Sequence, residues 1–242
     1  GVAKEPAVPV KEGYIFDGWY VSDDFSEKYD FGTKVTKNIT LYAKWTEDTQ
    51  TTTPGANATP FKDIGENDWF YNAVKYVYEG KLFSGISDDM FAPHNPLTRA
   101  MLVTVLWRAE GMPKTDFAVT FNDVDQGEYY AEALRWAASE NIVEGISETE
   151  FAPDNNITRE QIAAIMFRYA KLKGNVPEGE WAVSLDYSDI SDISDWALDA
   201  VMFCKLKGIM MGDDKNAFNP QNNATRAETA AIAQRFLESL NN

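Results

Sequence analysis

The chain has 242 residues, with 22 lysines and arginines against 38 aspartates and glutamates and a formal net charge of −16. Nucleic acid is an unsuitable partner for such an acidic chain, because its binding rests on the neutralisation of phosphates by Lys and Arg. The single cysteine, Cys204, excludes an internal disulfide. The single histidine, His94, argues against a zinc site or a catalytic mechanism with two imidazoles. No apolar run is long enough for membrane insertion.

The N-terminal segment contains two strand-like stretches. Residues 13–20 read GYIFDGWY, and residues 39–45 read ITLYAKW, whose alternation of apolar and polar side chains predicts a β-strand. Residues 13–45 resemble the second half of a Listeria–Bacteroides repeat, a small β-grasp-like module of Gram-positive surface proteins. The strand that opens this module has no counterpart, since only residues 1–12 precede it. We therefore expect residues 1–46 to form a partial module of this type.

Residues 47–60 separate this module from the rest of the chain. They contain the sequence TTTPG and show no apolar periodicity, which is typical of a flexible linker. We therefore place a domain boundary in this segment.

A repeated unit then occurs three times, at 61–120, 121–186 and 187–242, which we call copies one, two and three. Each copy has an aspartate near its start, a glycine in its middle and a Thr-Arg pair near its last apolar stretch. These shared positions are Asp63, Asp123 and Asp189; Gly85, Gly145 and Gly212; Thr98, Thr158 and Thr225; and Arg99, Arg159 and Arg226. Such a repeat predicts units that stack on their neighbours and share a core.

Each copy contains two stretches with apolar residues at helical spacing. In copy one these residues are Phe70, Ala73, Val74 and Val77, and then Leu102, Val105, Leu106 and Ala109. The segment between the two stretches is rich in Gly, Asp, Asn and Pro, which disfavours a helix there. The pattern therefore predicts a mainly α fold made of three helix–loop–helix repeats.

The Thr-Arg pair lies at the expected start of the second helix of each copy. A threonine there can cap the helix, and a Glu or Gln three residues later completes a capping box. Copy three keeps the box with Thr225 and Glu228 and copy two with Thr158 and Gln161, whereas copy one has Met101 and keeps half of it. Capping leaves the arginine unexplained, because a cation in the first turn opposes the helix dipole. An arginine retained three times against this preference indicates a function.

The combined layout, F-x-D-[IV], G-[IV]-x-x-G, F-x-P and T-R-[AE]-[EQ], resembles the S-layer homology domain family over roughly residues 61–238. In that family three tandem repeats form one pseudo-threefold unit, with the long helices at the centre and grooves between neighbouring repeats. The resemblance implies this fold here, next to the partial β-grasp-like module. It also implies an exported protein whose signal sequence and cargo domains lie upstream, with this chain as the anchor.

The resemblance further implies a ligand. The family's grooves bind secondary cell-wall polysaccharide, commonly through a pyruvylated amino sugar, and the motif arginine contacts the acidic group. By resemblance Arg99, Arg159 and Arg226 take this role, which suits a guanidinium that can form bidentate, charge-assisted bonds with a carboxylate. The position before the loop proline is often basic in the family, but here it holds Ala92, Ala152 and Asn219, so each groove has lost a cationic contact.

Twelve further residues are candidates for ligand binding. The threonines cap the helices beside the arginines, and the glycines allow a close approach of the sugar. The opening aspartates either bind backbone amides or pair with an arginine. An aromatic residue in each copy either stacks on a sugar ring or belongs to the core. The complete set is Thr98, Thr158, Thr225, Gly85, Gly145, Gly212, Asp63, Asp123, Asp189, Trp69, Tyr129 and Trp196.

The three grooves are expected to differ in strength. Copy one lacks the capping-box acceptor at Met101, and the loop of copy three carries Asp213 and Asp214, which repel an acidic sugar. Copy two keeps its cap and has the uncharged loop segment 145–147. We therefore expect the groove that contains Arg159 to bind most strongly.

Catalysis and metal binding are two alternative functions that the carboxylates of the chain could serve. Carboxylates are abundant enough for a glycosidase pair, but three similar copies favour three similar sites over one asymmetric catalytic centre. Residues 88–89 and 213–216 are rich in oxygen ligands, yet neither follows the EF-hand spacing with its closing Glu. We expect no catalysis, no metal and no cofactor.

The function expected from the sequence is a non-catalytic, extracellular anchor at the cell wall. Its partner is a cell-wall glycan, either secondary cell-wall polysaccharide or modified peptidoglycan, bound in the grooves between copies. One alternative is an assembly module that contacts other surface-layer subunits in a lattice, and another is the anchor fragment of a larger surface hydrolase. Concentration-dependent oligomerisation without glycan would favour the assembly module.

Overall fold

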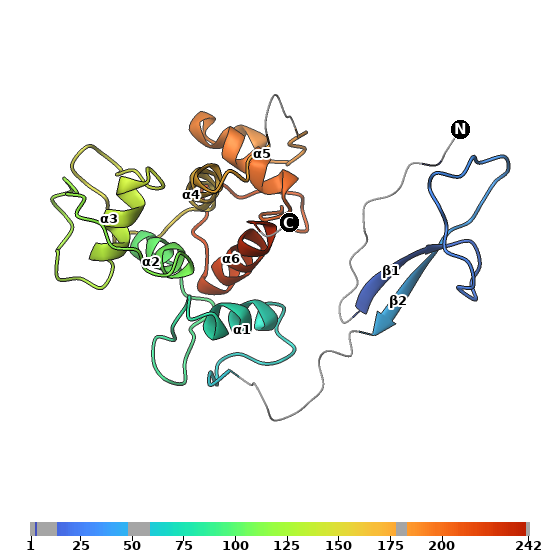
Figure 1. The fold of residues 1–242 in the computed structure, drawn as a ribbon, viewed down its shortest axis with the longest axis horizontal. Helices are drawn as coiled ribbons and strands as arrows, with labels where there is room; N and C mark the ends of the chain where they lie inside the picture. Colours follow the sequence, from blue (N-terminus) through green and yellow to red (C-terminus); the bar gives the residue numbers. More distant parts are fainter. Residues whose placement is uncertain (1–2, 4–13, 48–58, 178–182, 241–242) are drawn as a thin grey trace. The chain divides into compact units, whose positions relative to one another are not determined.

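The computed structural model describes residues 3, 14–47, 59–177 and 183–240 (Figure 1). The chain divides into two compact units, residues 1–57 and residues 58–242. Most of the linker expected at 47–60 lies outside the described residues.

The smaller unit contains one antiparallel pair of strands, β1 (Tyr14–Tyr20) and β2 (Tyr42–Glu47). Its aromatic side chains pack edge to face, since the ring of Phe16 lies 5.5 Å from that of Trp19 and 5.3 Å from that of Trp45. The expected strand at 39–45 starts too early, because β1 ends at Tyr20 opposite Tyr42 and leaves residues 39–41 without a partner strand. The sheet in the described part of this unit therefore has two strands.

The described residues of the larger unit form six α-helices, as the apolar periodicity predicted. Their bounds are α1 (Tyr71–Glu79), α2 (Arg99–Ala109), α3 (Ala131–Ser139), α4 (Arg159–Leu172), α5 (Leu198–Leu206) and α6 (Arg226–Leu240). Two short 3-10 helices, η1 (Ile190–Asp192) and η2 (Asp195–Ala197), precede α5. The helices α2, α4 and α6 lie toward the middle of the unit, and α1, α3 and α5 lie outside them (Figure 1). The prediction of a mainly α fold is confirmed.

The outer helices pack on the second helix of a different copy. Helix α3 of copy two packs on α2 of copy one, α5 of copy three packs on α4 of copy two, and α1 of copy one packs on α6 of copy three. The first and last helices of the larger unit are therefore partners. Each copy thus depends on another copy to cover its apolar helix faces.

Short extended segments before α2, α4 and α6 also connect the three copies. The backbone N–H of Leu97 donates to the oxygen of Ala224 at 2.9 Å, that of Ala224 to Ile157 at 3.0 Å, and that of Ile157 to Leu97 at 2.9 Å. The three hydrogen bonds form a closed ring in which every copy donates once and accepts once. All three side chains are fully buried.

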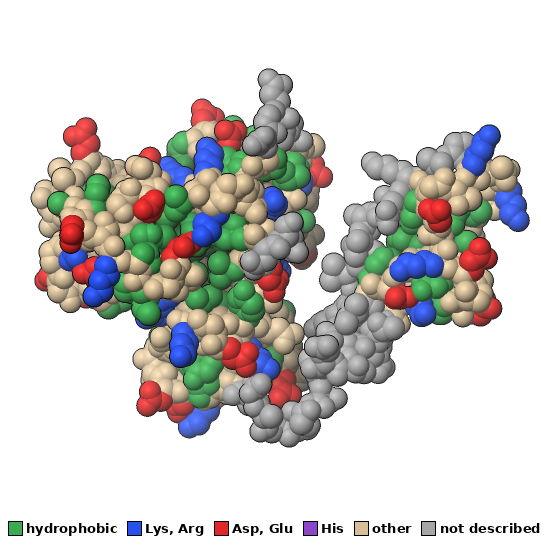
Figure 2. Space-filling model, viewed as in Figure 1, with side chains coloured by type: hydrophobic (Ala, Val, Ile, Leu, Met, Phe, Trp, Pro, Cys, Tyr) green, Lys and Arg blue, Asp and Glu red, His purple; other side chains and the backbone are tan. Residues whose placement is uncertain are grey.

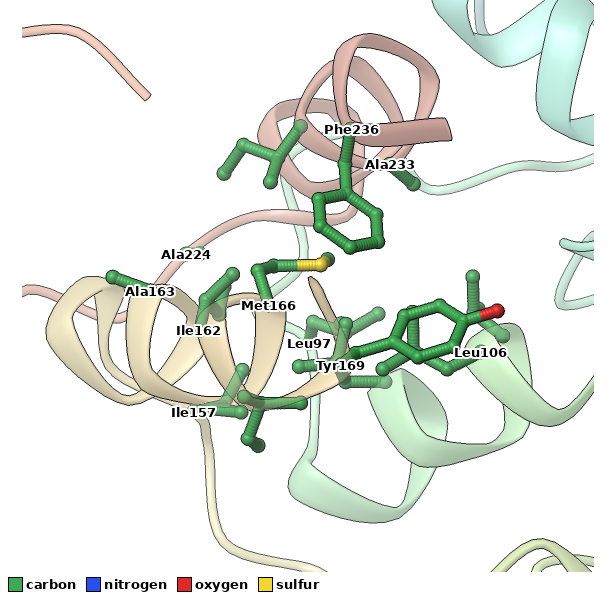
Figure 3. Close-up of a cluster of buried hydrophobic side chains, with 14 of the residues drawn as sticks. Leu97, Leu106, Ile157, Ile162, Ala163, Met166, Tyr169, Ala224, Ala233 and Phe236 are labelled. Atoms are coloured by element: carbon green, nitrogen blue, oxygen red, sulfur yellow. The ribbon is translucent and has the colours of Figure 1, made fainter. Parts of the chain in front are cut away.

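The core of the larger unit lies between α2, α4 and α6. Figure 3 shows Leu97, Ile157, Ile162, Met166, Tyr169 and Phe236 among the buried side chains drawn there. The rings of Tyr169 and Phe236 lie 5.4 Å apart, which joins α4 to α6. Among the described residues, no helix is both long and apolar enough to cross a membrane.

Candidate ligand-binding junctions between the copies

Each Thr-Arg arginine reaches from its own copy to the loop of another copy. The Nε of Arg99 donates to the backbone oxygen of Phe151 at 2.8 Å, and its Nη2 donates to that of Glu144 at 2.9 Å. The same pair of bonds joins Arg159 to the oxygens of Phe218 and Met211 at 2.7 and 2.9 Å, and Arg226 to those of Phe91 and Ser84, both at 2.7 Å. We call the sites of Arg99, Arg159 and Arg226 junctions 1, 2 and 3. They link copy one to two, two to three, and three to one.

The guanidinium groups also stack on aromatic rings. The guanidinium carbon of Arg99 lies 4.5 Å from the centre of the Phe151 ring, and those of Arg159 and Arg226 lie 5.1 and 4.6 Å from the centres of Phe218 and Phe91. This distance range gives an attractive cation–π interaction. The arginine that capping left unexplained therefore has a structural role, because it fastens one copy to the next.

Burial shapes the electrostatics of these arginines. Arg99 and Arg226 are each only 5% exposed, and burial lowers the pKa of both guanidinium groups. A buried charge is tolerated when hydrogen bonds replace its hydration, and here backbone oxygens do so. Each guanidinium has five N–H donors, of which the Nε and one Nη2 hydrogen are bound to these oxygens.

The opening aspartates bind the same loops, each within its own copy. The Oδ1 of Asp63 accepts from the backbone N–H of Phe91 at 2.8 Å, and its Oδ2 accepts from that of Ala92 at 2.6 Å. Asp123 and Asp189 make the same paired bonds to the loops of copies two and three. Of the two roles expected for the aspartates, the structure shows the binding of backbone amides.

The position before each loop proline has an unusual backbone conformation. Ala92, Ala152 and Asn219 have φ angles of 58°, 57° and 56°, which lie in the left-handed region. Non-glycine residues seldom adopt this region, and Asn tolerates it better than Ala. In each copy the residue whose N–H the aspartate's Oδ2 binds is this one. The aspartate therefore holds the loop in a conformation that the sequence disfavours.

Steric crowding within the protein itself explains why glycine occupies these loop positions. A Cβ added to Gly85 would lie 2.2 Å from the backbone oxygen of Ser87, and one added to Gly145 would lie 2.3 Å from that of Ser147. At Gly212 the nearest atom is a ring carbon of Tyr187, at 3.0 Å. The close approach of a sugar to these glycines remains a prediction, and the tight loop alone accounts for Gly85 and Gly145.

The motif aromatics lie on the surface. Trp69, Tyr129 and Trp196 are 62%, 56% and 57% exposed, so the alternative that they belong to the core is wrong. Burial raises the pKa of the Tyr129 phenol, and a hydrogen bond with Thr98, next to Arg99, lowers it. The Tyr129 phenol is also among the groups that raise the pKa of Arg226, so Tyr129 lies near Thr98 of copy one and Arg226 of copy three.

The other two aromatics are linked to the elements that contain or contact Arg159 and Arg226. Trp196 is part of η2, which packs on α4, the helix that Arg159 begins. Trp69 packs edge to face on Phe70, whose ring in turn packs on His94 at 5.8 Å. The backbone N–H of Arg226 donates to Asn95, the next residue, at 2.9 Å. Each exposed aromatic is therefore connected, through packing or hydrogen bonds, to a copy other than its own.

The helix caps differ between copies as the sequence predicted. Thr158 and Gln161 form a complete capping box, and the hydroxyl of Thr98 accepts only from the N–H of Met101, at 3.3 Å. In copy three the carboxylate of Glu228 accepts from the N–H of Thr225 at 2.7 Å, and the Glu228 N–H donates to the Thr225 hydroxyl at 3.2 Å. The first turn of α2 is therefore the least firmly capped.

The expected order of the grooves rested on pairing each arginine with the loop of its own copy. The structure pairs Arg159 with the loop of copy three, through Met211, and not with its own loop. Burial lowers the pKa of Arg159, and Glu228, Asp213 and other anionic neighbours raise it. The Asp213 charge that we assigned to the Arg226 groove is thus at Arg159, so the premise of that order is wrong.

Sequence reasoning missed one buried carboxylate at junction 2. Glu160 is 3% exposed, and it accepts from the N–H and the hydroxyl of Ser194, both at 3.0 Å, and from Nε2 of Gln221 at 2.8 Å. Copies one and three have Ala100 and Ala227 at this position. The difference between T-R-E and T-R-A was visible in the sequence, but the contact with copy three was not.

The remaining polar candidates do not converge on a second site. The Oδ1 of Asp213 accepts from the N–H groups of Lys215 and Ala217, both at 2.9 Å, within its own loop. Burial raises the pKa of the Cys204 thiol. In the part of the chain that the structure describes, no group of His, Cys, Asp and Glu side chains could hold a metal ion.

Comparison with known proteins identifies both units. The model of the S-layer homology domain matches residues 60–100, 120–163 and 186–230, and that of the Listeria–Bacteroides repeat domain matches residues 1–44. We expected the Listeria–Bacteroides module to lack its opening strand. That expectation concerns residues 1–12, of which the structure describes only residue 3.

Curated relatives share the region of the three copies. An endoglucanase of Bacillus sp. (strain KSM-635) is 32% identical over 75% of this chain and 19% of its own length. A surface-layer 125 kDa protein of Lysinibacillus sphaericus is 26% identical over 77% and 16%, and a cellulosome-anchoring protein of Acetivibrio thermocellus is 27% identical over 64% and 35%. The chain thus spans about a third or less of the length of these relatives. With three matched repeats covering more than half of its residues, the chain belongs to the S-layer homology domain family.

Proposed function

We propose that the larger unit is a pseudo-threefold, non-catalytic anchor that binds an acidic cell-wall glycan at the junctions between copies. The closed ring of backbone hydrogen bonds and the cyclic order of the arginine contacts support this symmetry. The family and its surface-layer and cellulosome-anchoring relatives place the chain outside the cell, at the cell surface. A secondary cell-wall polysaccharide with a pyruvylated amino sugar is the ligand we favour.

The arginines supply the positive charge for the acidic group of the sugar. Two of the five donors of each guanidinium fix it to a neighbouring loop, so its orientation is set before a ligand arrives. Among the described residues, Nη1 of Arg99 and of Arg159 has no hydrogen-bond partner, and Nη1 of Arg226 contacts only the sulfur of Met101, at 4.0 Å. A carboxylate can use these remaining donors, and a preorganised cation loses less entropy on binding than a mobile one.

The exposed aromatics carry the proposal. Three large aromatic side chains that are more than half exposed recur at the same place in each copy, on segments that contact another copy. The folded chain gains little from leaving them in water, whereas the C–H face of a sugar ring packs well on such a surface. A binding role for Trp69, Tyr129 and Trp196 explains their exposure.

Local charge predicts a new order of junction strengths. Arg99 has a second cation nearby, since burial and Arg168 lower its pKa and Asp123 raises it. Arg159 is surrounded by several acidic neighbours, including Glu228 and Asp213. Acidic and basic side chains are interspersed on the face of the larger unit in Figure 2, so such local differences decide where an anion binds. We expect an acidic sugar to bind more tightly at junction 1 than at junction 2.

The experiment uses aromatic variants, because arginine variants also remove contacts between copies. A Trp69/Tyr129/Trp196→Ala variant is expected to keep its melting temperature and to lose at least about tenfold in affinity for purified cell walls, or about 1.4 kcal/mol. A control with alanine at Phe117, Leu172 and Leu206, which are exposed but lie outside the repeated motif, should bind like the unchanged chain. Equal binding by all three proteins would refute the role of the aromatics.

The identity of the glycan needs a separate arm. Cell walls treated with hydrofluoric acid lose their secondary polysaccharide, so binding to them should disappear. Retained binding after treatment would indicate peptidoglycan instead. Calorimetry with a pyruvylated disaccharide on Arg99→Ala and Arg159→Ala then tests the order of the junctions, with circular dichroism to verify that both variants are folded.

Lattice assembly is the second candidate function. Ile86, Ile146 and Met211 are each more than half exposed in the loops that the arginines contact. Apolar side chains repeated on a surface fit a protein contact. Sedimentation of the chain without glycan distinguishes the two functions, because only assembly gives oligomers whose size rises with protein concentration.

A further inference from the structure

A cavity lies at the end of the central helices opposite to the arginines. It has a volume of about 660 Å³, and its lining includes Leu82, Ala109, Tyr169, Leu237 and Leu240. This size falls in the range of small-molecule sites in proteins. The arginines begin α2, α4 and α6, whereas the cavity is lined by residues at the ends of these helices, so it is separate from the three junctions.

The cavity lies where one copy lacks an aromatic side chain. When each copy is aligned on its Thr-Arg pair, Ala109 of copy one is in register with Tyr169 of copy two and with Phe236 of copy three. The two rings pack on each other at 5.4 Å. Figure 3 shows the Tyr169 ring extending from α4 toward α2, beside Leu106. Where a third ring would complete the cluster, the methyl group of Ala109 leaves a space.

The rim of the cavity is electrostatically negative. Four helices end there: Glu79 is the last residue of α1, Ala109 of α2 and Leu240 of α6, while Lys173 caps α4. Each helix C-terminus carries a partial negative charge of roughly half an electron. These four ends favour a cation over an anion in the cavity.

The charged side chains near the rim also leave the rim negatively charged. Lys173 pairs with Glu110 at 2.9 Å, and the hydroxyl of Tyr169 donates to the same carboxylate. Glu79 pairs with Lys75 at 3.9 Å. A third carboxylate is close to the rim, because burial and the charge of Glu238 raise the pKa of Tyr76.

We propose that this cavity binds an aromatic ammonium ion, with the aromatic ring in the space left by Ala109 and the ammonium group at the rim beside Glu79. The ring would pack on Tyr169 and on Leu237 and Leu240. The ammonium group would face the carboxylates and the helix ends. Such a ligand is either a free amine or the N-terminal residue of a peptide.

The experiment titrates the full chain with phenethylammonium and, separately, with the tripeptide amide Phe-Gly-Gly, whose N-terminal ammonium is next to a benzyl group. Saturable chemical-shift changes and intermolecular NOEs from the probe ring to Tyr169 and Tyr76 are expected for at least one probe. Binding of phenethylammonium alone identifies a site for free amines, and tighter binding of the tripeptide identifies a site for a peptide terminus. The absence of saturable binding by both probes would overturn the proposal.

Variants test the two halves of the site. Ala109→Phe fills the space and is expected to abolish binding while raising the melting temperature. Glu79→Gln should weaken binding by about 2- to 5-fold, the effect of a single exposed charge pair. The matched control, Glu66→Gln, removes a charge from the loop before α1 and should change nothing. Undiminished binding by Ala109→Phe, or NOEs to residues outside the cavity, would also overturn the proposal; if that variant does not fold, the NOEs to Tyr169 and Tyr76 decide alone.

Discussion

The two ends of α2, α4 and α6 differ in how closely the three copies agree. At the arginine end, each copy makes the same bonds to the next one, and the Nε atoms of Arg99, Arg159 and Arg226 donate at 2.8, 2.7 and 2.7 Å. At the other end the copies diverge, with Ala109, Tyr169 and Phe236 at one register position. Repetition therefore marks the surface that joins the copies, and divergence leaves an asymmetric cavity.

The largest expected effect comes from removing one copy. Deletion of residues 187–242 takes away α6, on which α1 packs, and α5, which packs on α4. It also opens the ring of backbone hydrogen bonds, so we expect the remaining two copies to lose cooperative unfolding. Differential scanning calorimetry checks this, and deletion of the separate unit 1–57 serves as a control that should retain a sharp transition. A sharp transition in residues 61–186 alone would disprove the interdependence of the copies.

Glycine substitutions test how tightly the repeated end is packed. Gly145→Ala places a Cβ 2.3 Å from a backbone oxygen, which cannot move away without a shift of the loop. We expect a loss of about 3 kcal/mol or more in the free energy of unfolding, the upper range for overpacking. Gly212→Ala meets the ring of Tyr187 at 3.0 Å and should cost about 1 kcal/mol. Chemical denaturation measures both, and equal losses would show that the loops of copies two and three are not packed differently.

The sequence predicted the arginine end of α2, α4 and α6, where the copies repeat the same contacts, better than the opposite end, where they diverge. Apolar spacing identified the helices, and the buried residues Val74, Leu102 and Leu106 lie where it placed the core. The Thr-Arg motif identified a special position, but periodicity cannot reveal that Arg99 contacts the loop of copy two. That contact depends on the packing of α3 on α2, a long-range arrangement.

Two details required the three-dimensional structure for the same reason. Pairing each arginine with its own loop is the natural assumption in a linear reading, and it assigned Asp213 to the wrong arginine. The cavity follows from the absence of a ring at Ala109, and an alanine on a helix face is an ordinary core residue in a sequence. Both details depend on which copies are neighbours, and not on which residues are helical.

A pH titration tests the effect of Tyr187, the residue at which copy three departs from the phenylalanine of the other copies. Tyr187 stands where copies one and two have Phe61 and Phe121, and burial raises its pKa from 10.0 to about 12. A raised pKa means that folding favours the protonated phenol, so this contribution is complete below pH 10 and is lost as pH rises through 12. The loss has an upper limit of about 2.7 kcal/mol, from 1.36 kcal/mol for each pH unit.

The matched variant for this titration is Tyr187→Phe. It restores the residue of the other copies and removes a buried hydroxyl that has no hydrogen-bond partner among the described residues. Its free energy of unfolding should therefore fall less steeply between pH 10 and 12 than that of the unchanged chain. Parallel curves for the two proteins would mean that Tyr187 does not titrate differently in the folded and unfolded states.

The smallest expected effect is the difference in stability lost when the helix caps of two copies are removed. The caps differ chemically between the copies, although the arginines beside them do not. Thr158→Ala removes a complete capping box and should cost about 1 kcal/mol in the free energy of unfolding, the usual value for a lost N-cap. Thr98→Ala removes a single cap bond, to the N–H of Met101, and also the hydrogen bond to the half-exposed Tyr129, and it should cost about 0.5 kcal/mol, the lower end of the range for such caps. Urea denaturation of both variants measures the difference, with Met101→Glu as a gain-of-function partner that supplies the missing acceptor. If Met101→Glu leaves stability unchanged, the first turn of α2 is held by the contacts of Arg99 with copy two, and the cap contributes little to the repeated end.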